Sequence, residues 1–340
     1  LVMTNPIIPE EIWRQFDAVI SKNSTFTITS HVNPDGDAVG SELALYNILQ
    51  KRNKKVKIIN NNPLPVVFNF LVDSPDVFGV FKDDPEKFHD WITKSDVIFI
   101  LDISNPDRLS RMNKCVTGSP AYKICIDHHE GNNLFADLNI INESACATAE
   151  LLYEAFSVLD CDIDIQTATA LYIAILTDTG SFSHSNTSEH AHYIASKLLG
   201  FGVNPGEIYK KVYESNTWQR TDLFQSALSD LKSECKGKIA WIKITDKMIN
   251  AAGAMREELE GFVDFPLTIT GVELSLLFLE VPGKGTKISL RSKEFLNVHD
   301  FAQRFGGGGH KYAAGIRMYD VDIENAIKLV IGKALEMFEE

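Results

Sequence analysis

Short apolar runs alternate with longer amphipathic segments over about the first 200 residues of the chain. In the longer segments apolar positions recur every three or four residues, which is the period of a helix covered on one face. The short runs are continuously apolar, as expected for strands buried on both faces of a sheet. The strands expected from these runs are 26–30, 56–59, 96–102 and 121–127. The helices expected are 38–52, 145–159 and 165–176.

This alternation predicts an α/β fold, with a mostly parallel sheet covered by helices on both faces. Further along the chain the pattern changes, and Pro282 to Gly285 read as the turn of a hairpin. The later helices expected are 190–199, 205–213, 218–234, 298–305 and 323–338. The later strands expected are 239–244, 272–281, 287–291 and 313–319. These elements predict a smaller α+β domain after the first.

The chain is long enough for two domains, since its 340 residues exceed the length of one average domain. We expect a first domain over 1–200, a helical connector over 201–235 and a second domain over 236–340. The active-site cleft is expected between the two domains.

Acidic and imidazole side chains follow the predicted strands of the first domain where each strand ends. They are His31, Asp35 and Asp37 after the first strand, Asp102 at the end of the third, Asp127, His128 and His129 at the end of the fourth, and Asp178 after the helix at 165–176. Sites in open parallel sheets form beyond the carboxyl ends of the strands. We therefore expect these segments to converge on one edge of the sheet.

Their ligand types favour a particular chemistry. Histidine with several aspartates, and no thiolate, suits a hard or borderline divalent ion such as Mn²⁺ or Mg²⁺, and imidazole favours manganese. Carboxylates crowded into one site repel one another, and cations relieve that repulsion. Two metal ions roughly 3.5–4 Å apart can share a bridging carboxylate and a water that attacks phosphorus in line.

Each of these segments alone has a simpler interpretation. A single aspartate at a strand end is more often a helix N-cap or a loop residue. Asp35 and Asp37 alone could form a turn before a helix, and the segment 127–129 alone could be a surface turn. The joint occurrence of all four segments by chance is much less expected.

Together these residues resemble the DHH phosphoesterase superfamily. The first motif runs from His31 to Ser41, and Asp102 with nearby Arg108 is the second. The segment Asp127-His128-His129 gives the family its name, and Asp178 lies in the fourth motif. Gly306 to Lys311 resembles the signature of the DHH-associated C-terminal domain. Length and motif order are similar to the branch of bacterial oligoribonucleases (nano-RNases) and pAp-phosphatases.

The resemblance implies a role for each motif residue. One metal ion would be held by His31, Asp35 and Asp102, and Asp102 would bridge to the second ion. The second ion would be held by Asp37, Asp102, His128 and Asp178. His129 would donate to the phosphate or to the leaving oxygen, and Asp127 would orient a histidine. The implied cofactors are two divalent ions, with Mn²⁺ expected and Mg²⁺ as the alternative.

Basic residues and glycines are concentrated in the second domain. Between Lys284 and Arg317 there are seven basic residues and two acidic ones. Arg291 follows a strand and could grip a phosphate through two N–H donors. Glycines allow the backbone to approach an anion closely. The substrate-binding residues expected are Arg291, His310, Gly307, Gly308, Gly309 and Arg108. A flexible loop for the glycines and a solvated face for the other lysines are the simpler alternatives.

The net charge of −13 disfavours tight binding of long duplex nucleic acid, which needs a broadly basic face. The five cysteines include no C-x-x-C pair, which is typical of reduced cysteines in the cytosol. The sequence has no apolar run near 20 residues and no leader-like N-terminus. We therefore expect a cytoplasmic protein without a membrane partner. The expected partners are short single-stranded RNA or small nucleotides, and a homodimer is a further candidate.

The function expected is hydrolysis of oligoribonucleotides of two to a few residues, with 3′-phosphoadenosine 5′-phosphate (pAp) as a further substrate. One alternative is a phosphodiesterase acting on cyclic or linear dinucleotides. Another is a pyrophosphatase or exopolyphosphatase, whose relatives differ in the C-terminal domain. A catalytically dead nucleotide-binding module is the alternative outside enzymes. The intact set of acids and histidines argues against it.

Overall fold

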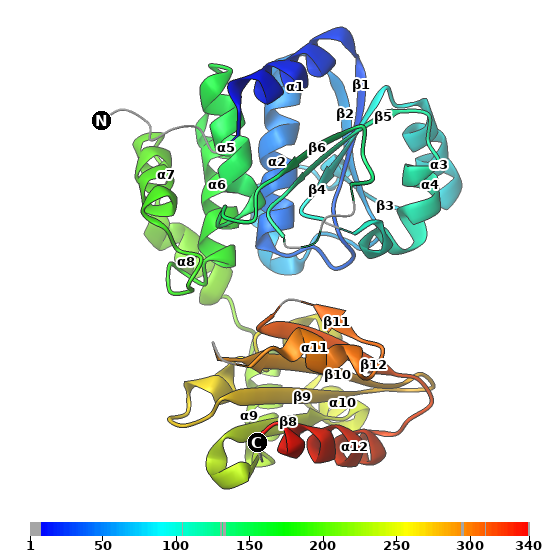
Figure 1. Ribbon diagram of the computed structural model, residues 1–340, viewed down its shortest axis with the longest axis vertical. Helices are drawn as coiled ribbons and strands as arrows, with labels where there is room; N and C mark the ends of the chain where they lie inside the picture. The colour runs from blue at the N-terminus through cyan, green and yellow to red at the C-terminus, as the bar shows by residue number, and fades with distance from the viewer. Residues whose placement is uncertain are drawn as a thin grey trace. The chain divides into compact units, whose positions relative to one another are not determined.

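A computed structural model of the protein describes residues 8–103, 105–129, 131, 134–293, 296–309 and 311–338. The chain divides into two compact units, Leu1–Ser215 and Asn216–Glu340. Each is described by itself below, with the labels of Figure 1. In the part of the chain that the structure describes, no helix combines the length and the apolar character needed to cross a bilayer.

The first unit is built on a six-stranded sheet with the order β3-β2-β1-β4-β5-β6 (Figure 1). All neighbouring strands in it are parallel. The strands are β1 (Thr25–Thr29), β2 (Lys55–Asn60), β3 (Phe78–Val80), β4 (Val97–Leu101), β5 (Tyr122–Asp127) and β6 (Leu138–Ile141). The α/β prediction is confirmed, and the sheet of this unit is parallel throughout. Two of its strands, β3 and β6, were not predicted.

Helices cover both faces of this sheet. The helices are α1 (Glu10–Lys22), α2 (Gly36–Lys51), α3 (Pro85–Lys94), α4 (Asn113–Thr117), α5 (Thr148–Val158), α6 (Ile165–Asp178), α7 (Glu189–Gly200) and α8 (Pro205–Tyr213). The larger core packs α1, α2, α5 and α6 against side chains such as Phe26 and Phe99. The opposite face places α3 and α4 on Ile98 and Ile100. Burial on both faces explains why the central strands are continuously apolar.

Short 3₁₀ segments connect several of these elements. They are η1 (Val66–Leu71), η2 (Pro75–Val77) and η3 (Pro106–Met112) in the first unit, and η4 (Cys235–Gly237), η5 (Arg256–Leu259) and η6 (Phe265–Thr268) in the second. In η3, Asn105 caps the first turn by accepting from the N–H of Asp107. This segment carries Arg108, one of the predicted substrate-binding residues.

The second unit contains a mixed six-stranded sheet in the order β11-β12-β10-β9-β8-β7. Its pairs are antiparallel except for the parallel pair β8–β9. The strands are β7 (Lys232–Glu234), β8 (Ile239–Ile244), β9 (Leu274–Val281), β10 (Gly285–Ser292), β11 (Gly308–Gly309) and β12 (Ala313–Met318). The helices are α9 (Trp218–Ser229), α10 (Asp246–Ala252), α11 (Val298–Gln303) and α12 (Ile323–Glu336).

The predicted helix over 218–234 was wrong at its C-terminal end. The helix α9 ends at Ser229, and residues 232–234 form β7, which pairs antiparallel with β8. All three residues of β7 are exposed and polar. This edge strand therefore leaves no alternation of apolar and polar residues in the sequence from which it could be predicted. The helix predicted over 298–305 is also shorter, because α11 ends at Gln303.

Candidate metal centre

Three parallel strands and two helix ends position the candidate metal centre in the first unit. His31 comes two residues after β1, Asp102 directly follows β4, and Asp127 is the last residue of β5. Asp35 is the N-cap of α2 and Asp178 is the last residue of α6. Because β1, β4 and β5 are parallel neighbours, their carboxyl ends meet at one edge of the sheet.

A first group of possible ligand atoms surrounds His31. Its Nε2 lies 3.5 Å from Oδ2 of Asp35 and 3.3 Å from Oδ2 of Asp102. His31 and Asp102 are buried, whereas the Asp35 side chain is about half exposed. The three ligand atoms are close enough to one another to hold a single metal ion.

A second group surrounds His128. Its Nε2 lies 3.7 Å from Oδ2 of Asp37, 3.6 Å from Oδ1 of Asp102 and 3.6 Å from Oδ2 of Asp178. Asp37, His128 and Asp178 also lie close enough together to hold an ion. Asp102 therefore turns one oxygen toward each histidine, as a bridging carboxylate would.

The two histidines are held in the orientation that metal ligands need. The Nδ1 of His31 lies 3.0 Å from the carbonyl of Val32, and that of His128 lies 3.2 Å from the carbonyl of Ala145. In the tautomer that donates Nδ1–H to these carbonyls, each Nε2 presents a lone pair. Both Nε2 atoms are buried without a hydrogen-bond partner. Such an unpartnered polar atom is costly, and a cation bound there would satisfy it.

His129 is placed differently from the other two histidines. Its Nδ1 lies 2.6 Å from Oδ1 of Asp127 and 3.4 Å from Oδ1 of Asp102. Asp127 is fully buried, so this hydrogen bond fixes the orientation of the His129 ring. The groups able to hold a metal ion also include Asp102, His128 and His129 together.

The charges in the cluster perturb one another strongly. Burial, and after it the neighbouring Asp102 carboxylate, together raise the pKa of Asp37 to about 7. Burial opposes the charged form of His31, but its contacts with Asp102 and Asp35 raise its pKa to about 10. Burial likewise disfavours charged His128, yet Asp178 and Asp37 raise its pKa to about 9. Without a cation the cluster therefore retains protons, and bound cations would take the place of those protons.

Sequence reasoning missed the polar groups that hold Asp37 and Asp102. Asp37 accepts hydrogen bonds from the backbone N–H of Thr148 at 2.6 Å and of Ala149 at 3.1 Å. It thereby caps α5, whose own N-cap residue Ala147 makes no side-chain cap. The Thr148 hydroxyl donates to Oδ1 of Asp102 at 3.2 Å. No sequence spacing signals these contacts, because they join residues 46 and 111 positions apart.

Two further residues adjoin the cluster. Asn186 donates through Nδ2 to Oδ2 of Asp178 at 3.3 Å and to the carbonyl of Cys146 at 3.0 Å, which ties the end of α6 to the loop before α5. Arg108 is half-buried, and its carbonyl accepts from the N–H of Val32 at 2.8 Å. The segment that carries Arg108 is thus held beside the His31 loop by its backbone, and the role of Arg108 in substrate binding stays a prediction.

In the second unit the structure describes most of the predicted substrate-binding residues. Arg291 lies on β10, and its Nε is 3.0 Å from Oδ1 of Asp264. A Cβ at Gly307 would lie 2.2 Å from the carbonyl oxygen of Gly315, so Gly307 permits close backbone packing. Gly308 and Gly309 form β11, paired with β12. His310 lies outside the described residues. The binding roles of these residues stay predictions.

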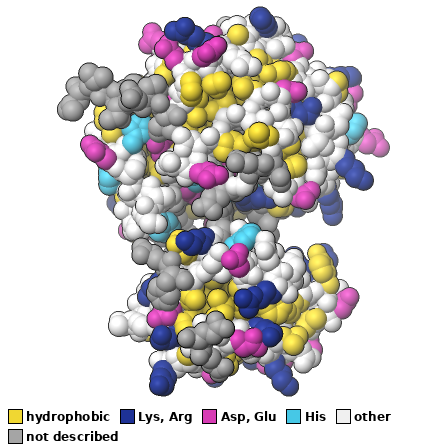
Figure 2. All heavy atoms as spheres, in the orientation of Figure 1, with side chains coloured by type: hydrophobic (Ala, Val, Ile, Leu, Met, Phe, Trp, Pro, Cys, Tyr) yellow, Lys and Arg dark blue, Asp and Glu magenta, His cyan; other side chains and the backbone are white. Residues whose placement is uncertain are grey.

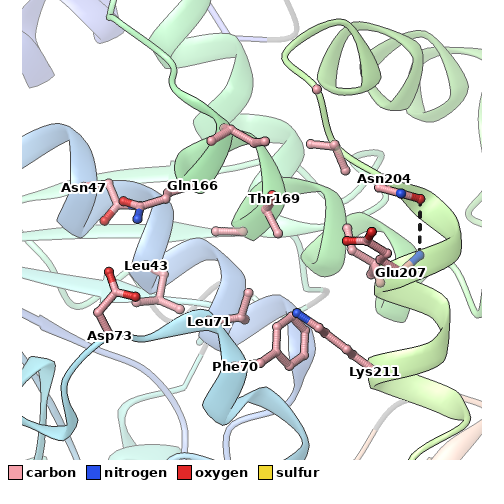
Figure 3. A pocket seen from close by; sticks show the side chains of 15 residues that line it. Leu43, Asn47, Phe70, Leu71, Asp73, Gln166, Thr169, Asn204, Glu207 and Lys211 are labelled. Atoms are coloured by element: carbon pink, nitrogen blue, oxygen red, sulfur yellow. Dashed lines mark hydrogen bonds between the residues drawn. The ribbon is translucent and has the colours of Figure 1, made fainter.

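A separate hollow of about 230 Å³ opens on the first unit between α2, η1, α6 and α8. Figure 3 shows Phe70 and Lys211 side by side at its edge, with Asn47 and Gln166 on the other side. The Nζ of Lys211 lies 4.6 Å from the centre of the Phe70 ring, so this ammonium group already has an aromatic partner. None of the predicted site residues lines this hollow.

Comparison with known proteins identifies the family. A model described as the DHH family, N-terminal domain, matches residues 25–194, and the DHHA1 domain matches residues 242–337. The chain belongs to the DHH family.

Curated relatives and solved structures agree with this assignment. The bifunctional oligoribonuclease and PAP phosphatase NrnA of Thermus thermophilus is 29% identical over 309 residues, covering 89% of this chain and 87% of the relative. NrnA of Bacillus subtilis is 24% identical, covering 89% and 92%. A crystal structure of an exopolyphosphatase-related protein from Bacteroides fragilis matches with a TM-score of 0.92 and 31% identity, covering 98% of both chains.

Proposed function

We propose that the protein is a two-metal phosphoesterase that hydrolyses oligoribonucleotides of two to a few residues to mononucleotides. The observation that carries this proposal is the pair of buried Nε2 atoms of His31 and His128, which have no hydrogen-bond partner and face opposite oxygens of Asp102. Two imidazoles that share one carboxylate in this way suit two neighbouring divalent ions. The names of the NrnA relatives supply the substrate class, and they add PAP as a second substrate.

Each histidine group would hold one ion. His31, Asp35 and Asp102 would hold the first ion, because their ligand atoms form one of the compact groups. The ligands of the second ion would be Asp37, Asp102, His128 and Asp178. We expect Mn²⁺ in both positions, since imidazole among carboxylates favours it over Mg²⁺. Bound ions would supply an activated water and neutralise charge on the phosphate.

The remaining residues act around that water and the substrate. Asp127 fixes His129, which can donate a proton or a hydrogen bond to the phosphate or to the leaving oxygen. Thr148 and the N-terminus of α5 hold Asp102 and Asp37 in position. Arg108, on the segment beside the His31 loop, is available to bind a phosphate oxygen.

The second unit would bind the nucleotide part of the substrate. Lys287 and Arg317 stand opposite each other on β10 and β12, and Arg291 lies four residues further along β10 on the same face. Lys287 is exposed, and partial desolvation together with the nearby Arg317 and Arg291 lowers its pKa. Within the described residues neither Lys287 nor Arg317 forms an ion pair. Cations placed close together on a strand pair repel one another, and a bound anion would relieve that repulsion, which supports this part of the proposal.

Short substrates fit the surface charge better than long duplexes do. On the face drawn in Figure 2, basic and acidic side chains of the described residues are interspersed and form no broad surface of one sign. The chain is acidic overall, with a net charge of −13. A long duplex would meet repulsion beyond the few cationic positions that a dinucleotide can use.

Two other activities that hydrolyse phosphorus–oxygen bonds are supported by particular relatives. The cyclic-di-AMP phosphodiesterase PdeA of Listeria monocytogenes is 27% identical, but the match covers only 48% of that protein. The Bacteroides fragilis neighbour is described as exopolyphosphatase-related. These names keep cyclic dinucleotides and polyphosphate as competing substrates.

A turnover panel separates these candidates. The protein is stripped with EDTA, reloaded with Mn²⁺ and assayed on RNA dinucleotides, longer RNA, pAp, cyclic dinucleotides, pyrophosphate and polyphosphate. We expect the highest kcat/KM on RNA dinucleotides, a measurable rate on pAp and no turnover without metal. A preference for pyrophosphate or polyphosphate would reject the proposal in favour of the exopolyphosphatase alternative.

A further inference from the structure

A fully buried acid lies behind the metal cluster and has no part in the function proposed above. Glu42 lies on α2 with its side chain shielded from solvent, and it accepts a hydrogen bond from Nδ2 of Asn60 at 2.9 Å. Asn60 is the last residue of β2 and is 1% exposed. A carboxyl group is placed in an apolar interior only at a cost, so its contacts need an explanation.

The other end of the Asn60 amide reaches the segment that carries His31. Oδ1 of Asn60 accepts from the backbone N–H of Ser30 at 3.1 Å and from the Thr29 hydroxyl at 3.3 Å. Ser30 immediately precedes His31 and lies just beyond the end of β1. A chain of hydrogen bonds therefore runs from Glu42 through Asn60 to the backbone next to His31.

The acceptor at Glu42 decides which way the Asn60 amide points. An amide can rotate by half a turn and exchange its oxygen and nitrogen. With the carboxyl of Glu42 accepting from Nδ2, the oxygen is directed at Ser30. Without that acceptor, the rotated amide would turn N–H groups toward the Ser30 N–H, and that hydrogen bond would be lost.

We propose that Glu42 and Asn60 are positioning residues for His31, which they hold at the distance from Asp35 and Asp102 that metal binding requires. This inference rests on the proposed metal role of His31. Burial, the largest influence, raises the pKa of Glu42 to about 8 against the opposing effects of Asn60 and Ser30. Neutral and charged Glu42 both keep an oxygen that accepts from Asn60, so the positioning needs no particular protonation state.

Two substitutions of equal size separate positioning from packing. Glu42→Gln retains an oxygen that accepts from Asn60, whereas Glu42→Met fills the same space without an acceptor. Glu154→Gln is the matched control, because Glu154 is a second buried acid whose contacts with Ile8 and Trp13 lie outside the cluster. Asn60→Ala removes the central link of the chain.

The measurement is the Kd for Mn²⁺, determined by electron paramagnetic resonance on the full chain without substrate. We expect Glu42→Met and Asn60→Ala to weaken binding by about tenfold, as loss of supporting partners does at metal sites. Glu42→Gln and Glu154→Gln should stay within about twofold of the wild type. If Glu42→Met binds Mn²⁺ like the wild type, or if Glu42→Gln is impaired as much as Glu42→Met, the proposal is wrong.

Failure of this inference is distinguishable from failure of the proposed function. His31→Ala, measured in the same titration, should lose one of the two proposed Mn²⁺ sites or weaken Mn²⁺ binding at least as much as Glu42→Met does. If His31→Ala and the wild type bind equally, the metal role of His31 is wrong and this inference fails with it. If His31→Ala is impaired and Glu42→Met is not, only the positioning role is wrong. Should Asn60→Ala fail to fold, the two Glu42 variants still decide the question.

Discussion

Asp102 presents Oδ2 to Nε2 of His31 at a distance of 3.3 Å. Its other oxygen, Oδ1, lies 3.6 Å from Nε2 of His128, so one carboxylate faces both histidine groups. Asp102 adopts a left-handed backbone conformation with φ of 61°, which is uncommon outside glycine. The backbone therefore accepts an unfavourable conformation at the residue that joins the two halves of the cluster, as functional sites often do.

Loss of the Asp102 carboxylate, which the two proposed metal ions would share, should remove activity. We expect Asp102→Ala to lower kcat on an RNA dinucleotide by about 10³-fold or more, because a centre that loses its shared ligand no longer holds both cations. Asp96→Ala is the control, since Asp96 lies at the opposite end of the same strand and accepts from the N–H groups of Ser24 and Thr25. Wild-type turnover by Asp102→Ala would overturn the assignment of Asp102.

Metal affinity should rise with pH. In the metal-free protein the raised pKa values of His31, about 10, and His128, about 9, mean that both are protonated below those values. A cation must displace these protons, so lower pH weakens binding, by up to about tenfold per pH unit for each proton released. Mn²⁺ titrations between pH 6.5 and 9 test this. An affinity that does not change with pH would contradict the proposed ligands.

The hydroxyl of Thr148 should support the bridge. Thr148→Val keeps the shape of the side chain but removes the donor to Asp102. We expect kcat to fall by about ten- to a hundredfold, because a hydrogen bond to a charged group is worth about 1.5–3 kcal/mol. Thr148→Ser retains the donor and should keep most of the activity. Equal rates for the two variants would exclude this role.

The cationic positions of the second unit should act on substrate binding. Arg291→Ala should raise KM for an RNA dinucleotide about tenfold or more with a smaller effect on kcat, because a bidentate contact to phosphate is lost. The double variant Lys287→Gln and Arg317→Gln should raise KM more for longer oligonucleotides than for pAp. The control is Lys328→Gln on α12, an exposed lysine of the same unit. Unchanged KM values in all variants would show that Arg291, Lys287 and Arg317 do not bind the substrate.

The central strands were predictable because their environment leaves a signal in the sequence. Residues 97–101 are all buried, and they appear as a continuous apolar run. The strand β8 and the helix α8 were predicted to the residue, since alternation in the former and an Asn-Pro start in the latter mark them clearly. By contrast, β7 has no buried residue, and only its pairing with β8 makes it a strand.

The acids and histidines of the site were predictable from their positions after strands, because parallel topology brings strand ends together. The groups that hold them were not. Thr148, Asn186 and Asn60 contact the cluster or its supporting segments through tertiary packing, and each is an ordinary polar residue in its local sequence. Their roles follow only from the folded arrangement.

The proposal of two cations is tested most directly by anomalous diffraction at the manganese edge from crystals of the full chain soaked in Mn²⁺. The account predicts two peaks roughly 3.5–4 Å apart, one bound by Nε2 of His31 and the other by Nε2 of His128, with Asp102 contacting both. A single peak, or peaks remote from these three side chains, would contradict it.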